Sequence, residues 1–409
     1  MSTTLPPTYL TLLRGRNFAL LFAGQAISRL GDGLHEVALL WLVLGLTGSA
    51  FITGTVLAVQ LLPTLFFGLV AGALVDRWDR RRTMIAADAA RVVLVLLIPL
   101  LNSLGALTLW SLYVISFFLA TFGQLFRPAL MASLPNVVPG EALMSANALM
   151  GMTRQLGGIA GPALGGLLVS LTGLNSVFYV DAATFGVSGY AIYLASVPGD
   201  VHAKVSLTVR AVTREIREGL AYMRGQRAVL TLAILGILSH AYWGAIPVVV
   251  PAFADRVLGG GSATYGLLLS SMNLGMVAGG LLIGSAGRGR HRGRLVVAGY
   301  TGMAAGITAL GFARTPAQGM AVIALSGAVS MLSVVPFFAL LQDIVPDHYR
   351  GRVLSTDESL EHGILPIVYG TAGYLADAVG TRETFWVVGG VMLLVTVAGV
   401  VLKPIRAAR

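Results

Sequence analysis

Long apolar stretches, interrupted by short polar turns such as Thr47-Gly48-Ser49, follow one another along the whole chain. Each is close to the roughly 20 residues that a helix needs to cross the hydrocarbon core of a bilayer. The pattern predicts an all-α polytopic membrane protein with twelve transmembrane helices. The predicted spans cover residues 18–46, 50–75, 83–104, 106–128, 144–172, 174–197, 228–256, 262–287, 295–313, 316–341, 353–378 and 383–402.

The composition of the 409 residues excludes a soluble protein, since 56% are apolar and 11% charged, against about 25% charged in an average globular chain. The chain contains no cysteine, which excludes disulfides, thiolate metal sites and cysteine nucleophiles. It also has no Gly-x-x-x-x-Gly-Lys-Ser/Thr phosphate-binding loop. We therefore expect neither an enzyme nor a bound cofactor or metal.

The net charge of +10 follows the predicted topology. Of the 28 Lys and Arg residues, 22 fall on one set of alternate loops, which the positive-inside rule places in the cytoplasm. This predicts a multi-pass protein of the cell (inner) membrane with both termini cytoplasmic, and argues against nucleic-acid binding. Three arginines lie within spans; of these we expect Arg91 to form a structural pair with Asp88, one turn away.

The second half of the chain repeats the first at an offset near 210 residues, as in Gly48-Ser-Ala50 and Gly261-Ser-Ala263. We predict two pseudo-symmetric six-helix bundles, at residues 1–197 and 228–409. A cytoplasmic linker at 198–227 connects them and contains an amphipathic helix. Such paired bundles suit alternating access, in which one half rocks against the other.

The loop after the second predicted span resembles the signature of the major facilitator superfamily, Gly-x-Leu-x-Asp-Arg-x-Gly-Arg-Arg/Lys. The matching residues are Gly72, Leu74, Asp76, Arg77, Arg80, Arg81 and Arg82. The departure is Asp79, where the family usually has glycine. The resemblance implies the major facilitator fold, and for Asp76 and Arg80 a conformational latch in which the aspartate supports the N-terminus of the eleventh span.

The fifth predicted span resembles the antiporter motif of the same superfamily, Gly-x-x-x-Gly-Pro-x-x-Gly-Gly. The matching residues are Gly157, Gly161, Pro162, Gly165 and Gly166. Glycines four apart form a groove for a neighbouring helix, and proline bends the span. The first span, with Arg16-Asn17-Phe18 and Trp41-Leu42-Val43, is similar to the branch of drug:proton antiporters that includes macrolide efflux and siderophore-export proteins.

This resemblance implies secondary-active, proton-coupled efflux of lipophilic, cationic, drug-like small molecules. We expect a monomer that interacts with its substrate, protons and membrane lipid. A dedicated exporter of a siderophore or metabolite, and an uptake symporter of the same fold, remain alternatives. A receptor or scaffold that transports nothing is a remote one.

Ionisable residues inside predicted spans are candidates for proton coupling, because charge at the bilayer centre costs about 2.5–3.5 kcal/mol. Arg29, Asp32 and Glu36 share one face of the first span at i, i+3 and i+7. Arg29 neutralises one carboxylate, which leaves the other as a proton carrier; a permanent structural ion pair is the alternative. Glu361 and His362 in the eleventh span form the second candidate pair.

Polar and aromatic residues inside other spans are candidates for lining a substrate cavity. They are Arg29, Gln124, Arg154, Gln155, His240, Tyr242, Trp243, Asp357 and Glu358. A packing or bracing role is the alternative for each. Helix length places Asp357 and Glu358 near cytoplasmic solvent, where salt bridges to Arg80 or Arg352 are equally expected.

Overall fold

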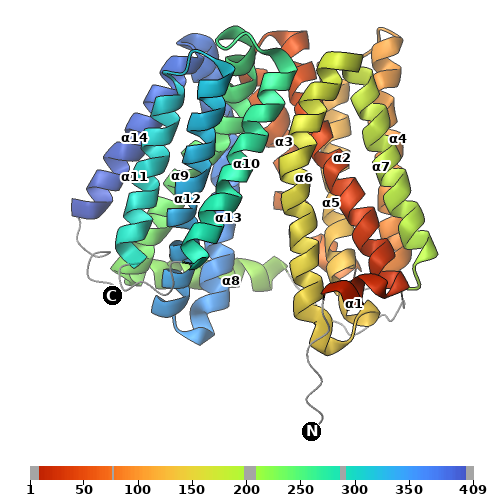
Figure 1. The fold of residues 1–409 in the computed structure, drawn as a ribbon. Helices are drawn as coiled ribbons and strands as arrows, with labels where there is room; N and C mark the ends of the chain where they lie inside the picture. Colours follow the sequence, from red (N-terminus) through yellow and green to blue (C-terminus); the bar gives the residue numbers. More distant parts are fainter. Residues whose placement is uncertain (1–8, 76–77, 198–208, 286–291, 402–409) are drawn as a thin grey trace. The chain divides into compact units, whose positions relative to one another are not determined.

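The computed structural model describes residues 9–75, 78–197, 209–285 and 292–401, and all of its regular elements there are helices (Figure 1). They are α1 (Tyr9–Arg14), α2 (Arg16–Thr47), α3 (Ala50–Val75), α4 (Arg80–Ser103), α5 (Leu109–Val137), the 3-10 helix η1 (Gly140–Ala142), α6 (Leu143–Thr172), α7 (Leu174–Leu194), α8 (Val209–Gly225), α9 (Arg227–Arg256), α10 (Gly261–Ser285), α11 (Arg292–Leu310), α12 (Pro316–Ile344), α13 (Asp347–Ala378) and α14 (Thr381–Val401).

Eight helices in the described part of the chain are long and apolar enough to cross a membrane: α2, α4, α5, α6, α7, α9, α10 and α12. The other four predicted spans coincide with α3, α11, α13 and α14. Charged residues reduce the apolar length of two of these, at Arg292 and Arg294 in α11 and along the first half of α13. The predicted fold class, an all-α polytopic membrane protein, is confirmed.

The chain forms two compact units. The first consists of residues 1–39 and 59–207, and the second of residues 40–58 and 208–409. This division differs from the predicted bundle boundaries at residues 40–58. That segment contains the start of α3, which the Asp377 carboxylate of α13 caps. It accepts hydrogen bonds from the backbone N–H groups of Ala50 and Phe51, both at 2.9 Å.

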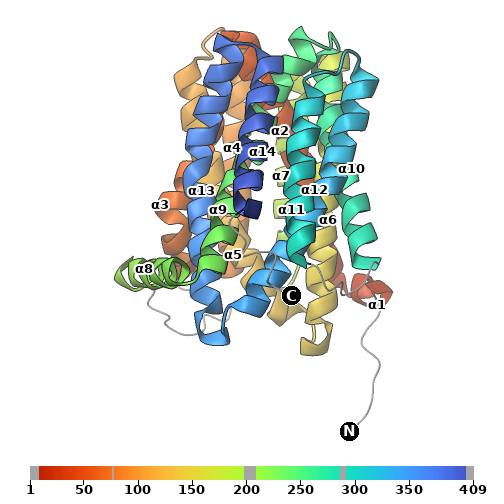
Figure 2. The ribbon, with the colours of Figure 1, turned by 90° about the vertical axis from the view of Figure 1, so that its left-hand side faces the viewer.

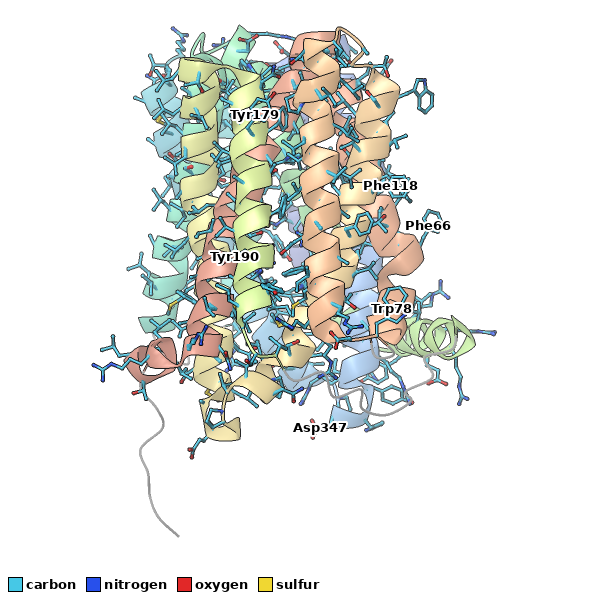
Figure 3. The ribbon with its side chains drawn as sticks, turned by 90° about the vertical axis from the view of Figure 1, so that its right-hand side faces the viewer. Phe66, Trp78, Phe118, Tyr179, Tyr190 and Asp347 are labelled. Atoms are coloured by element: carbon cyan, nitrogen blue, oxygen red, sulfur yellow. The ribbon has the colours of Figure 1, made fainter. Side chains whose placement is uncertain are left out.

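In the first unit, α4 packs against α5 and α7, and α6 packs against α7. The buried core includes Phe18, Met84 and Phe126. Large aromatic side chains also point outward: Figure 3 shows Tyr179 and Tyr190 on the outer face of α7, where they are 52% and 62% exposed. Exposed aromatic side chains on a transmembrane helix are expected where it faces lipid.

In the second unit, α12 packs against α10 and α11, and α13 packs against α9 and α8. Helix α8 is the predicted amphipathic helix and lies crosswise to α9 and α13 (Figures 1 and 2). Glu218 of α8 accepts a hydrogen bond from Arg214 at 2.8 Å and pairs with Arg352 of α13 at 3.2 Å. Tyr222 stacks on Tyr349 with 4.5 Å between ring centroids. These contacts attach α8 to the N-terminal part of α13.

Candidate functional site

The antiporter motif places α6 directly against the backbone of α2. A Cβ atom added at Gly157 would lie 2.6 Å from the carbonyl oxygen of Arg29, and one at Gly161 would lie 2.8 Å from Cα of Gly33. At Gly165 the nearest atom would be Cα of Leu34, at 2.9 Å. Each of these distances is below normal contact. The motif glycines therefore allow α6 to pack closely against α2, the span that carries the predicted proton-coupling acids Asp32 and Glu36.

The predicted acidic face of α2 is present and accessible. Arg29 donates a hydrogen bond to Asp32 at 3.1 Å, as their i, i+3 spacing predicts, and the two side chains are 32% and 36% exposed. Glu36, two turns beyond Arg29, is exposed. The face therefore holds one paired carboxylate and a second one beside it, an arrangement compatible with either proton exchange or bracing.

The first unit contains two buried ion pairs, one within α4 and one between α2 and α7. The expected pair of Asp88 and Arg91 is confirmed at 2.6 Å, and the Arg91 guanidinium stacks over the Phe185 ring. The second pair was not predicted: His35 Nδ1 of α2 lies 2.9 Å from the Asp181 carboxylate of α7. The Asp181 side chain is 0% exposed and that of His35 is 13% exposed.

The remaining predicted residues of the first unit do not form a single group. Gln124 donates to the Thr64 hydroxyl at 2.5 Å, which ties α5 to α3. Arg154 and Gln155 of α6 are exposed. Among the described residues, the charged groups that act on Arg154 are two other arginines, Arg29 and Arg127.

The second unit contains a pocket of about 370 Å³. It is lined by three of the predicted residues, His240, Trp243 and Glu361. His240 Nε2 lies 3.9 Å from the Glu361 carboxylate. The rest of the lining is mainly aromatic side chains and methionine: Ser239, Met276, Tyr300, Met303, Met331, Ser333, Val334, Phe337 and Phe338. One carboxylate and one imidazole are thus set in an apolar, adaptable wall.

Tyr242 does not line this pocket. Its side chain is fully buried, and its hydroxyl is 2.8 Å from that of Ser326 in α12. Tyr242 and Trp243 are neighbours in sequence, so they point about 100° apart on the helix and do not share a face. Tyr242 contributes to the core, while Trp243 reaches the pocket.

The prediction that Asp357 lies near solvent is wrong, because its side chain is 3% exposed. Of its two expected partners, Arg352 instead pairs with Glu218 of α8, and Arg80 donates to the carbonyl of Ala132. Glu358 is exposed, and its backbone carbonyl lies 2.8 Å from His362 Nδ1. Glu361 is therefore the member of this acidic segment that reaches the pocket, and His362 does not line it.

Two arginines of the loop signature bind the ends of neighbouring helices within the first unit. Arg80 donates to the carbonyl of Ala132 in α5 at 2.8 Å. Arg81 donates to the carbonyls of Ile192, at 3.3 Å, and Tyr193, in the last turn of α7. Cations are stabilising there because the helix dipole is negative at its C-terminus.

The departure from the signature has a local function. Asp79, in place of the usual glycine, accepts a hydrogen bond from the backbone N–H of Arg82 at 2.7 Å and caps α4. Gly72 lies in α3. Asp76 and Arg77 lie outside the described residues, so the latch remains a prediction.

Residues 7–408 match the sequence family described as transmembrane secretion effector, which belongs to the major facilitator superfamily. The chain belongs to this family. It is therefore a multi-pass membrane transporter and not an enzyme. Two similar proteins are macrolide efflux protein A of Streptococcus pyogenes, 27% identical over 95% of this chain and 96% of the relative, and the multidrug efflux pump Tap of Mycolicibacterium fortuitum, 29% identical over 96% and 97%.

Solved structures support the fold alone, because their sequence identity to this transporter is low. A POT family transporter in complex with 5-aminolevulinic acid matches with a TM-score of 0.75 at 12% identity, over 96% of this chain and 97% of the other. The nucleoside transporter NupG matches with a TM-score of 0.72 at 12% identity, over 94% and 100%.

Proposed function

We propose that this transporter exports lipophilic, cationic, drug-like molecules in exchange for protons, by alternating access. It acts as a monomer in the cytoplasmic membrane with both termini inside. The observation that best supports this proposal is the position of the Glu361 carboxylate. It lines the pocket of the second unit, among aromatic and methionine side chains.

The chemistry of the pocket favours an apolar cation. Aromatic faces attract cations, a carboxylate supplies the countercharge, and methionines adapt to ligands of different shape. Its volume of about 370 Å³ lies within the range for small-molecule sites, roughly 300–1,000 Å³. The names of the two relatives, a macrolide efflux protein and a multidrug efflux pump, agree with this proposal in the direction of transport and in drugs as substrates.

Proton coupling needs acids that exchange protons with water, and those of α2 fit this requirement. Asp32 is partly exposed and Glu36 is exposed, on a span that the antiporter motif holds at Gly157 and Gly161. Protonation of these acids removes charge from the membrane interior and changes the relative stability of the two orientations. In this scheme Glu361 binds the cation, and Asp32 and Glu36 bind protons.

The test is transport of several unrelated labelled cations, such as ethidium and tetraphenylphosphonium, by the purified protein in proteoliposomes with an imposed pH gradient. Gradient-dependent accumulation of several of these compounds supports the proposal. Accumulation that is unaffected by the gradient contradicts proton coupling, and an absence of movement contradicts the assignment of these substrates.

A dedicated exporter is the second candidate, because the positive charges of Arg29 and Arg127 in the first unit act on the exposed Arg154. Such a cluster favours an anionic compound. If an anionic siderophore or metabolite is transported and the cations are not, this second function replaces the first.

A further inference from the structure

The pair formed by His35 and Asp181 lies within the first unit and takes no part in the scheme above. His35 Nδ1 is 2.9 Å from Asp181 Oδ2, and its ring packs edge-on against Phe178 at 5.6 Å between centroids. Neither oxygen of the Asp181 carboxylate has a hydrogen-bond partner among the described residues, and His35 Nδ1 has none either, so the contact between the two groups is one of charge at short distance. A Cβ at Gly31 would lie 2.7 Å from Oδ1, so the carboxylate is pressed against the backbone of α2.

The charged groups around Asp181 come from each helix that packs on α7. Helix α2 contributes His35 and Asp32, and Glu36 of the same helix acts on His35. Helix α4 contributes Arg91, which is already paired with Asp88 at 2.6 Å. Helix α6 has one charged residue, Arg154, and it is exposed. In the described part of the chain, His35 is therefore the one basic group within 4.0 Å of Asp181.

The two buried pairs differ in whether they need an added proton to have zero net charge. Arginine is always protonated, so the pair of Asp88 and Arg91 is neutral without taking up a proton. Histidine is charged only when protonated. The pair of His35 and Asp181 is therefore neutral only when it holds one proton, on either residue. Loss of that proton leaves an uncompensated negative charge at 0% exposure, which low-dielectric surroundings strongly disfavour.

We propose that His35 and Asp181 form a proton-binding site inside the first unit, which holds one proton while α2 packs against α7 as observed. The site releases the proton only when water reaches Asp181, which requires α2 and α7 to separate at Gly31. Asp32, one turn before His35 and partly exposed, is the accessible acid that exchanges protons with it. The role of the site in antiport rests on the proposed function, whereas the binding of the proton does not.

Infrared spectroscopy of the purified protein tests the proton site without any substrate. In the variant His35→Asn, Asp181 can avoid a buried charge only by holding the proton itself. We expect a protonated-carboxyl C=O band that persists in mildly alkaline solution and is missing from the double variant His35→Asn/Asp181→Asn. Identical spectra of the two variants in this region overturn the proposal.

Transport by the variant Asp181→Asn tests the role of the site. Exchange of labelled for unlabelled tetraphenylphosphonium, at equal concentrations on the two sides of the membrane, needs no net proton movement. This exchange should be retained. Accumulation driven by a pH gradient should fall about tenfold or more, within the usual range for coupling between sites. Undiminished accumulation overturns the role, and so does loss of exchange by a folded variant.

The matched control is Ser188→Ala on the same helix. It removes a buried hydroxyl that accepts a hydrogen bond from Gln25 at 3.2 Å but does not titrate. We expect this variant to keep both exchange and accumulation; a loss of accumulation equal to that of Asp181→Asn overturns the role. If the wild-type protein transports no cation, the proposed function fails and the infrared comparison still decides the proton site.

Discussion

Replacing Gly161 with alanine should separate α6 from α2. The added Cβ would lie 2.8 Å from Cα of Gly33 and 3.0 Å from the carbonyl oxygen of Leu30. Carbon atoms in good contact are about 3.5–4.0 Å apart, so the two helices must move by about 1 Å. Both opposing atoms belong to the backbone and cannot rotate away. Overpacking of this kind typically costs about 1–3 kcal/mol.

Gly151, on the same helix, is the matched control, because a Cβ there meets nothing within 4 Å. The Gly151→Ala variant should be as stable as the wild type or more stable, by up to about 1 kcal/mol, since alanine favours a helix over glycine. We therefore expect the free energies of unfolding of the two variants, measured by denaturant titration in mixed micelles, to differ by about 1–4 kcal/mol. Equal stabilities would refute the close packing of α2 and α6 at the antiporter motif.

Three further substitutions test other parts of the structure. The Asp377→Ala change removes the carboxylate that caps α3 and should lower the free energy of unfolding by about 1 kcal/mol; unchanged stability in the same titration contradicts the cap. The Glu361→Gln change should weaken binding of tetraphenylphosphonium roughly tenfold, or about 1.4 kcal/mol, whereas Glu383→Gln in α14 should leave the titrated affinity unchanged; equal effects contradict the pocket assignment. The hydrogen bond from Arg214 lowers the pKa of Glu218, so the contact of α8 with α13 is complete above the ordinary carboxyl pKa and is lost as the pH falls through the lowered value. The protection of the α8 amides against hydrogen exchange, measured relative to the intrinsic exchange rate at each pH, should therefore fall on acidification below about pH 4, and in Glu218→Gln at neutral pH. Protection that is the same in this variant and the wild type contradicts the contact.

Local patterns in the sequence predicted the helices and the contacts within them. Hydropathy located the spans, helical spacing predicted the contact of Arg29 with Asp32, and charge alternation predicted the amphipathic α8. The glycine spacing of the antiporter motif also predicted a close approach of another helix. These features depend on residues a few positions apart, so sequence alone determines them.

The contact of His35 with Asp181 was not predicted. His35 and Asp181 are far apart in sequence, and hydropathy does not say which helices are neighbours. A signal was present, since both are ionisable residues inside predicted spans, where charge needs a partner. The burial of Asp357 was not predicted, because the position of a residue along a helix does not reveal which other helices pack around it. The grouping of residues 40–58 with the second unit likewise depends on a long-range contact, that of Asp377 with the start of α3.

The most direct test of proton-coupled export is simultaneous measurement of both fluxes in proteoliposomes. A pH-sensitive dye inside the vesicles reports protons while labelled tetraphenylphosphonium reports the cation. The account predicts that an imposed pH gradient drives the cation up its own gradient, and that each addition of cation moves protons in the opposite direction. Cation movement without accompanying proton movement, or in the same direction as the protons, would contradict it.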